Sequence, residues 1–267
     1  MSTNIEWTNE TWNPVTGCTR ISAGCKNCYA ERMARRLAGR YGYLPWPYEF
    51  DVTFHEDKLY QPLSWKKPRM IFVCSMGDLF HEDVKEETIL QIFDVIRKTK
   101  QHTYQILTKR PERMKWIVKQ YSDYGATNFN KMMPHVWLGV TAESQQAADE
   151  RIPWLLKTPA AIRFVSVEPM LEKIDLTGSL NGFPDRDKNG EWYQTYPALD
   201  WIICGGETGH GAREMKYEWA QELYVQCKAA GVAFFFKKFG DAYTGNLWSK
   251  LSLVAATREY PKGVGDV

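Results

Sequence analysis

Long apolar runs and a strong charge imbalance are both missing from this sequence. No uninterrupted apolar stretch of about 18 residues occurs, so we expect neither a membrane-spanning helix nor a membrane partner. The 34 Lys and Arg residues against 32 Asp and Glu residues leave a net charge of +2. This balance excludes a polybasic protein that binds nucleic acids non-specifically, although it leaves room for a local basic groove.

Cysteines are scarce, and so are the features of an exported protein. Six cysteines in 267 residues are too few to build a disulfide scaffold. The segment from Met1 to Glu6 has no basic stretch followed by an apolar one, so no secretory signal is expected. We therefore expect a protein of the reducing cytoplasm. Cys74, Cys204 and Cys227 lie alone, the first two within apolar runs, as buried free thiols commonly do.

Two common catalytic motifs are absent, whereas aromatic residues are abundant. The sequence has no Gly-x-Ser-x-Gly elbow of an α/β hydrolase and no phosphate-binding loop of the Walker type. Aromatic side chains make up 14% of the chain and include 11 Trp. This excess indicates either a Trp-rich core or stacking surfaces for a planar substrate or cofactor, and composition leaves both open.

The remaining three cysteines, Cys18, Cys25 and Cys28, fall within eleven residues. The surrounding segment from Gly17 to Tyr29 is polar and contains glycine, so it is predicted to be a loop. Three thiolates on one loop repel one another unless a metal neutralises their charge. The spacing therefore indicates a metal or cluster site.

The number of cysteines favours an iron–sulfur cluster over zinc. A structural zinc ion normally has four protein ligands, and the nearest histidine, His55, lies beyond a long intervening segment. A cubane cluster has four irons, so three cysteines leave one iron open to a non-protein ligand. We predict a [4Fe-4S] cluster with an exchangeable site, with zinc and unliganded thiols as the alternatives.

The rest of the chain alternates between apolar runs and helical patterns, roughly 30 to 35 residues apart, which is the size of one βα unit. Near-continuous apolar strands are typical of a parallel sheet buried on both faces. The expected strands are Thr11–Val15, Met70–Cys74, Thr103–Leu107, Val136–Val140, Ile162–Val167, Trp201–Cys204 and Val232–Phe236. The expected helices are Tyr29–Gly39, Glu86–Lys98, one that opens at Pro111, Ser144–Leu156 and Tyr217–Ala230.

This alternation predicts an α/β fold, a partial or complete parallel βα barrel, rather than a Rossmann sheet. We expect one domain over residues 1–267. Two segments, 41–65 and 181–197, have the Pro, Gly and aromatic content of insertions. The tail after residue 240 is irregular.

Polar clusters follow most of the predicted strands, where a parallel barrel places its chemistry. Lys109 and Arg110 suit a carboxylate or phosphate, and Glu143 suits a ribose hydroxyl. Taken singly, such residues also occur as strand-end caps or surface charges. The residues at these strand ends are Asp78, His81, Lys109, Arg110, Glu143, Glu168, Glu207, Lys237 and Lys238.

The cysteine loop after a first strand resembles the radical S-adenosylmethionine (SAM) superfamily. More closely, the chain resembles a phage and prophage family known by its three-cysteine motif, and more distantly spore photoproduct lyase and related DNA-repair proteins. The resemblance covers most of residues 5–240. It is carried by Trp12-Asn13-Pro14, Gly17-Cys18, Gly24-Cys25-Lys26-Asn27-Cys28-Tyr29-Ala30-Glu31, Ser75-Met76-Gly77-Asp78-Leu79-Phe80-His81, Leu107-Thr108-Lys109-Arg110-Pro111, Ser166-Val167-Glu168-Pro169-Met170-Leu171, Gly205-Gly206-Glu207-Thr208-Gly209 and Phe235-Phe236-Lys237-Lys238-Phe239-Gly240.

The resemblance implies a radical SAM enzyme, whether lyase, isomerase or modifying enzyme. Cys18, Cys25 and Cys28 would ligate three irons, and the open iron would chelate SAM. An electron from a donor such as flavodoxin or ferredoxin would release a 5′-deoxyadenosyl radical. The implied cofactor-binding residues, with Gly77 and Asp78 at the amino group of SAM and Glu143 at its ribose, are Tyr29, Ser75, Gly77, Asp78, Lys109, Glu143 and Glu168. The implied substrate-binding residues are His81, Arg110, Glu207 and Lys237.

The sequence departs from the usual superfamily pattern in three places. Six and then two residues separate its cysteines, in place of three and then two. Asn27 stands where an aromatic residue commonly precedes the third cysteine, with Tyr29 as a candidate substitute. Ser75-Met76-Gly77-Asp78 stands where a Gly-Gly-Glu element usually follows the second strand, and Gly205-Gly206-Glu207 lies at the sixth strand instead. These differences leave cluster binding as the expectation and the SAM contacts open.

The implied substrate is a nucleic acid or nucleotide, in base modification or DNA repair. Arginines beside the cysteine loop suit phosphate groups, although a solvated helix face would look the same. Two other functions remain: a zinc-stabilised nucleic-acid-binding module, which would need His55 or His81 as fourth ligand, and an iron–sulfur redox or partner-binding protein without SAM cleavage. The arginines concerned are Arg32, Arg35, Arg36 and Arg40.

Overall fold

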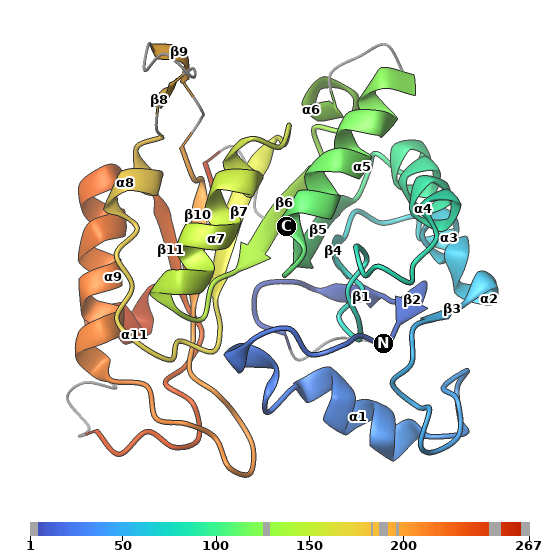
Figure 1. Ribbon diagram of the computed structural model, residues 1–267, viewed down its shortest axis with the longest axis horizontal. Helices are drawn as coiled ribbons and strands as arrows, with labels where there is room; N and C mark the ends of the chain where they lie inside the picture. Colours follow the sequence, from blue (N-terminus) through green and yellow to red (C-terminus); the bar gives the residue numbers. More distant parts are fainter. Residues whose placement is uncertain are drawn as a thin grey trace. The chain divides into compact units, whose positions relative to one another are not determined.

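Seven strands form the main sheet of the computed structural model, which describes residues 5–124, 129–182, 184–186, 192–195, 198–245 and 252–262. Their order is β1-β4-β5-β6-β7-β10-β11, and the fold is α/β with a parallel sheet, as predicted (Figure 1). The strands are β1 (Glu10–Trp12), β4 (Met70–Val73), β5 (Thr103–Thr108), β6 (Val136–Thr141), β7 (Ile162–Val167), β10 (Trp201–Cys204) and β11 (Ala233–Phe236).

The strand predicted at Thr11–Val15 is two strands, because the chain breaks between them at Pro14. Proline has no backbone N–H to donate to a parallel ladder. The residues after it form β2 (Val15–Thr16), which pairs antiparallel with β3 (Thr53–Phe54) inside the predicted insertion 41–65. A second antiparallel pair, β8 (Pro184–Arg186) and β9 (Trp192–Thr195), falls in the predicted insertion 181–197.

The long helices lie where the sequence predicts them, although the first ends at Leu37 rather than Gly39. In α7 the side chain of Ser144 caps the first turn by accepting the backbone N–H of Ala147, and α9 ends at Gly231 in the left-handed conformation. The helices are α1 (Tyr29–Leu37), α2 (Glu56–Leu59), α3 (Gln61–Ser64), α4 (Glu86–Lys98), α5 (Pro111–Tyr124), α6 (Phe129–Met132), α7 (Gln145–Leu156), α8 (Thr177–Leu180), α9 (Tyr217–Ala230) and α11 (Leu253–Ala256). In the ranges that the structure describes, none is long and apolar enough to cross a membrane.

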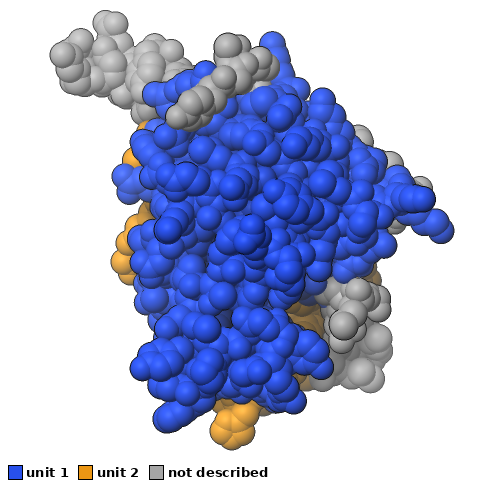
Figure 2. Space-filling view, turned by 90° about the vertical axis from the view of Figure 1, so that its right-hand side faces the viewer, with its two compact units in different colours: residues 1–138, 159–161, 267 blue, residues 139–158, 162–266 orange. Residues whose placement is uncertain are grey.

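The chain forms two compact units (Figure 2). Unit 1 comprises residues 1–138, 159–161 and 267, and unit 2 comprises residues 139–158 and 162–266. Unit 1 contains β1, β4 and β5, and unit 2 contains β7, β10 and β11, while β6 has residues in both. Of the predicted insertion and tail, residues 183, 187–191, 196–197, 246–251 and 263–267 lie outside the described residues.

Many aromatic side chains are buried in the cores of the two units. In unit 1 the buried rings of Trp12 and Tyr104 meet edge to face, and in unit 2 Trp201 meets Phe235 in the same way. Trp46 is an exception, since 76% of it is exposed. The structure therefore shows both buried and exposed aromatic rings, and stacking of the exposed rings on a planar substrate or cofactor stays a prediction.

Candidate metal centre

The three clustered cysteines lie on the segment that joins β2 to α1 in unit 1. Cys18 follows β2, Cys25 ends the short 3₁₀ helix η1 (Ala23–Cys25), and Cys28 directly precedes α1. Their thiols are free and partly exposed. The other three cysteines are free and buried, as their sequence context predicts. Only the clustered thiols are therefore both accessible and near one another in the chain.

Close backbone contact fixes the position of Cys18. Gly17 forms a parallel bridge with Gly77, and its N–H donates to the carbonyl of Met76 at 2.9 Å. A Cβ on Gly17 would lie 2.2 Å from the carbonyl oxygen of Asp51, and one on Gly77 would lie 2.8 Å from that of Gly17. Gly17 also has a φ of +87°, so glycine is required there for conformation as well as for space.

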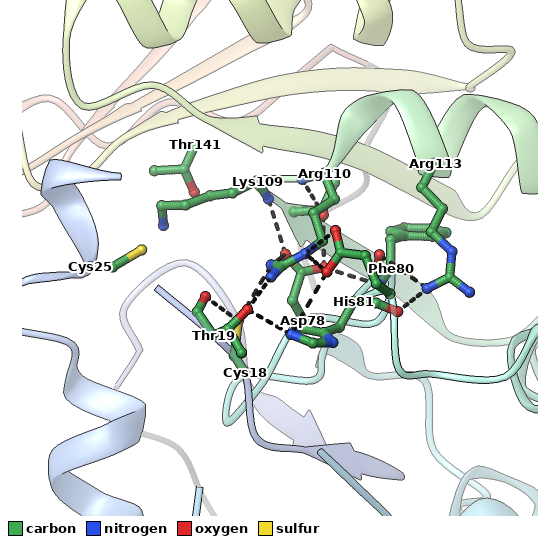
Figure 3. Close-up of polar contacts among 12 residues, drawn as sticks. Cys18, Thr19, Cys25, Asp78, Phe80, His81, Lys109, Arg110, Arg113 and Thr141 are labelled. Atoms are coloured by element: carbon green, nitrogen blue, oxygen red, sulfur yellow. Dashed lines mark hydrogen bonds and ion pairs between the residues drawn. The ribbon is translucent and has the colours of Figure 1, made fainter. Parts of the chain in front are cut away.

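Asp78, at the turn after β4, organises the groups around Cys18 (Figure 3). Its carboxylate accepts the Thr108 hydroxyl at 2.7 Å, the Lys109 backbone N–H at 3.1 Å and Arg110 Nη1 at 3.2 Å. The side chain is buried. Its oxygens are thus occupied by donors from the end of β5, and its predicted contact with the amino group of SAM stays a prediction.

Arg110 connects this carboxylate to the cysteine loop. Its Nη1 donates to Cys18 Sγ at 3.4 Å, its Nη2 to Thr19 Oγ1 at 2.9 Å and its Nε to the Glu82 carboxylate at 2.8 Å. Burial alone would lower the pKa of Arg110, but Asp78 and Cys18 raise it above its ordinary value. The guanidinium is therefore a fixed positive charge beside Cys18.

His81 takes part in the same network as a neutral ring. Its Nδ1 accepts the backbone N–H of Asp83 at 3.1 Å, so its proton is on Nε2, which donates to Thr19 Oγ1 at 2.8 Å. Burial and the nearby Arg110 lower the pKa of His81. We expect an uncharged imidazole at neutral pH, with both nitrogens engaged.

Two of the loop thiols differ in acidity. Burial, with a contribution from Asp78, raises the pKa of Cys18 to about 11, although Arg110 opposes this. Burial would also raise the pKa of Cys25, but the charge of Lys109 and hydrogen bonds from Ile21 and Ser22 lower it overall. Figure 3 shows the Lys109 side chain extending towards Cys25. The consecutive cations Lys109 and Arg110 thus act on different cysteines.

Ser75 and Tyr29 are two further residues of unit 1 that the sequence predicts to bind the cofactor. The Ser75 hydroxyl donates to Asn13 Oδ1 at 3.1 Å, and the same oxygen accepts the backbone N–H of Met76 at 3.1 Å. Tyr29, at the start of α1, is exposed. Ser75 therefore stabilises the turn after β4, and Tyr29 presents an accessible ring next to Cys28.

The predicted residues of unit 2 form ion pairs within that unit. Glu168 Oε1 lies 3.0 Å from Lys237 Nζ, and the Glu207 carboxylate accepts a hydrogen bond from Arg213 Nε at 2.9 Å. Buried Glu143 lies 2.8 Å from the Nη1 atom of Arg151 on α7. These residues are strand-end acids with basic partners, and their predicted contacts with SAM or substrate stay predictions.

A family model described as "Protein of unknown function (DUF5131)" matches residues 2–262. The chain belongs to this family. No curated protein matches it. Among solved structures, a spore photoproduct lyase mutant is similar, with a TM-score of 0.47 and 13% sequence identity over 89% of this chain and 79% of that chain. The family description leaves the activity to be derived from the site.

The histidines that zinc would need are engaged elsewhere. His55 Nε2 lies 2.7 Å from Thr16 Oγ1, and both ring nitrogens of His81 are hydrogen-bonded. Across the described ranges, no three His, Cys, Asp or Glu side chains are grouped so that they could hold a metal ion. A zinc site brings all its ligands onto one ion, whereas each cysteine of a cubane cluster binds a different iron.

Among the residues of the network that were not predicted from the sequence are Asn13, Thr19 and Glu82. Thr19 and Glu82 directly follow the predicted residues Cys18 and His81, and Asn13 lies in the first motif of the resemblance. The signal that the sequence offers for these three residues is their position next to a predicted residue or within a motif. Their roles as acceptors for Ser75 and Arg110 depend on side-chain geometry that spacing does not show.

Proposed function

We propose that this protein is a radical SAM enzyme that binds a [4Fe-4S] cluster through Cys18, Cys25 and Cys28. The observation that supports this most is a loop with three free, accessible thiols, one hydrogen-bonded to Arg110 and another beside Lys109. The resemblance to the three-cysteine radical SAM family, which also rests on motifs outside the cysteine loop, supports it as well. The alternative with zinc lacks a free imidazole at His81, and at His55 the Nε2 atom already lies 2.7 Å from Thr16 Oγ1.

The donor set fits such a cluster. Thiolates are the protein ligands of iron–sulfur clusters, and three of them leave one iron for a non-protein ligand. Their negative charge needs compensation, which Arg110 and Lys109 provide from the end of β5. Neither cation is on the cysteine loop itself, so the β5 end supplies charge and the loop supplies ligands.

When bound, the cluster supplies the electron that cleaves the sulfonium of SAM, so that hydrogen can be abstracted from a substrate. The chain holds the cysteine loop by the backbone contact of Gly17 with Gly77 and by the Cys18 N–H, which donates to the Phe50 carbonyl at 3.1 Å. Tyr29 has an exposed ring for contact with SAM. In this proposal a small donor such as flavodoxin or ferredoxin delivers the electron.

The experiment is anaerobic purification and reconstitution, followed by iron and sulfide analysis and by incubation with SAM and a reductant. We expect a brown protein that releases 5′-deoxyadenosine. Cys25→Ala should lose colour and SAM cleavage, whereas Cys227→Ala, which removes a buried thiol of α9, should keep both. A colourless, iron-poor wild type would contradict the proposal.

The same measurements separate the alternatives. A wild type that contains zinc and no sulfide would indicate the zinc-stabilised module. A reconstituted protein that holds iron and sulfide but never releases 5′-deoxyadenosine would indicate a redox or partner-binding protein.

For the substrate we propose a nucleic acid or nucleotide. The segment after α1 exposes Tyr41 and Trp46, and the arginines Arg36 and Arg40 are exposed beside it in sequence. Tyr43 of the segment is buried in one cluster with Ala30 and Ala34 of α1, so helix and segment pack together. Exposed aromatic rings stack on bases and arginines contact phosphates, which is the usual composition of a single-strand binding surface.

Fluorescence anisotropy with a labelled single-stranded oligonucleotide tests this substrate class. Trp46→Ala should weaken binding roughly 5- to 150-fold, because stacking on an aromatic ring contributes about 1–3 kcal/mol per base. Arg36→Ala should reduce the salt dependence by about one phosphate contact. Trp116→Ala, which removes a ring of α5 that is 51% exposed, should have no effect. Equal binding by Trp46→Ala and wild type would exclude this surface.

A further inference from the structure

A buried arginine beside a candidate cluster ligand requires an explanation. The Arg110 side chain is only 5% exposed, and removing a guanidinium from water is costly unless its donors are matched. Asp78 and Glu82 supply two carboxylates for one positive charge. Charge balance is therefore satisfied without Cys18, yet Nη1 lies within hydrogen-bonding distance of both Asp78 Oδ2 and Cys18 Sγ.

The orientation of the guanidinium is fixed on every side. Glu82 accepts Nε through both oxygens, at 2.9 and 2.8 Å, and Thr19 accepts Nη2. The Arg110 backbone N–H donates to Thr108 Oγ1 at 2.9 Å, directly before α5 begins at Pro111. The planar guanidinium held in this way directs one N–H towards Cys18 Sγ. The single ammonium group of a lysine cannot make all of these hydrogen bonds at once.

We propose that Arg110 is a positioning residue that raises the reduction potential of the cluster through its hydrogen bond to Cys18, an inference that rests on the proposed function. Reduction adds one negative charge to the cluster and its thiolates. Hydrogen bonds to the sulfurs and nearby positive charge stabilise that reduced state. Asp78 lies close enough to act in the opposite direction, so loss of Arg110 would also leave its carboxylate uncompensated.

This changes the function assigned to Arg110. The sequence predicts a residue that holds a substrate carboxylate or phosphate. In the structure its donors face Cys18, Thr19, Asp78 and Glu82, all within unit 1. An arginine engaged in this way acts on the electron-transfer step and not on substrate affinity.

The test is a redox titration, followed by electron paramagnetic resonance, of reconstituted wild type, Arg110→Lys and Arg110→Gln. We expect both variants to assemble the cluster with a lower reduction potential, and the neutral Gln variant to shift further. Arg113→Lys is the matched control: Arg113, on α5, donates to the backbone carbonyls of Phe80, His81 and Val84 and should leave the potential unchanged.

The outcomes separate this inference from the proposed function. If the wild type binds no iron, the proposed function fails and this inference with it. If Arg110→Lys and Arg110→Gln carry full clusters at the wild-type potential, only the assignment of Arg110 is wrong. Should the Arg110 variants not fold, Thr19→Val removes an acceptor of the guanidinium and retains the arginine. Its potential must then fall below that of the wild type, and an unchanged value rejects the assignment.

Discussion

Glu143 and Arg151 form a strongly enclosed ion pair among the residues that the structure describes. Their side chains are 1% and 8% exposed, and the same arginine Nη1 donates to the Thr141 carbonyl at 2.8 Å. Removal of one partner leaves an uncompensated buried charge. We expect Glu143→Ala to lower the free energy of unfolding by about 3–5 kcal/mol, measured by urea denaturation.

Glu150→Ala is the control for this prediction. Glu150 lies exposed on the same helix, α7, where it accepts a hydrogen bond from Gln146 Nε2, and surface substitutions of this kind change stability by about 0.5 kcal/mol or less. Equal stability of Glu143→Ala and Glu150→Ala would show that the buried pair contributes little. Glu143 would then be available for the ribose contact that the sequence predicts.

Individual site residues are more predictable from sequence than their partners. The three cysteines, Asp78 and Arg110 stand out by spacing and by position after apolar strands. The Arg110 contacts with Glu82 and Thr19 join residues 28 and 91 positions apart, and no local pattern encodes such pairs. The sequence predicts Arg110 as a substrate ligand and does not show this network, because residue type alone does not indicate which acceptor a guanidinium meets.

At the scale of elements, the crossing of the cysteine loop over the turn after β4 depends on glycine. We expect Gly17→Ala to destabilise the protein by about 2–5 kcal/mol, since overpacking against Asp51 adds to the strain of a positive φ. Gly39→Ala, also at positive φ but with no atom within 4 Å of its added Cβ, should cost about 1–2 kcal/mol. Urea denaturation of both variants measures the difference, and equal losses would mean that the crossing adapts without cost.

The regular elements follow from local patterns, and the irregular ones do not. Continuous apolar runs such as Ile162–Val167 mark strands buried on both faces, and β7 has these bounds. Two-residue strands such as β2 and β3 have too few residues for any periodicity. The pairing of β2 with β3 depends on the turn at Pro14 and on a hydrogen bond in which the His55 N–H donates to the Pro14 carbonyl at 2.8 Å. This contact joins segments that are distant in the sequence.

For the whole molecule, histidine burial sets the response to acid. Burial is the largest cause that lowers the pKa of four of the five histidines, His55, His81, His102 and His135. They stay neutral in the folded protein, while the unfolded chain takes up protons as the pH falls below the ordinary histidine value of about 6.5. Stability is therefore fully present above that pH and is lost below it.

Each buried histidine steepens this loss by at most about 1.4 kcal/mol per pH unit. Urea denaturation between pH 7.5 and 5.5, a range chosen to lie above most carboxyl titrations (roughly pH 4), should show a falling free energy of unfolding. His102→Gln should flatten the slope, because His102 is buried with its Nδ1 unpartnered and Arg69 also disfavours its protonation. His210→Gln alters an exposed side chain and should leave the slope unchanged. A wild type whose stability is constant over this range would show that the imidazoles become protonated without unfolding, and the burial argument would be wrong.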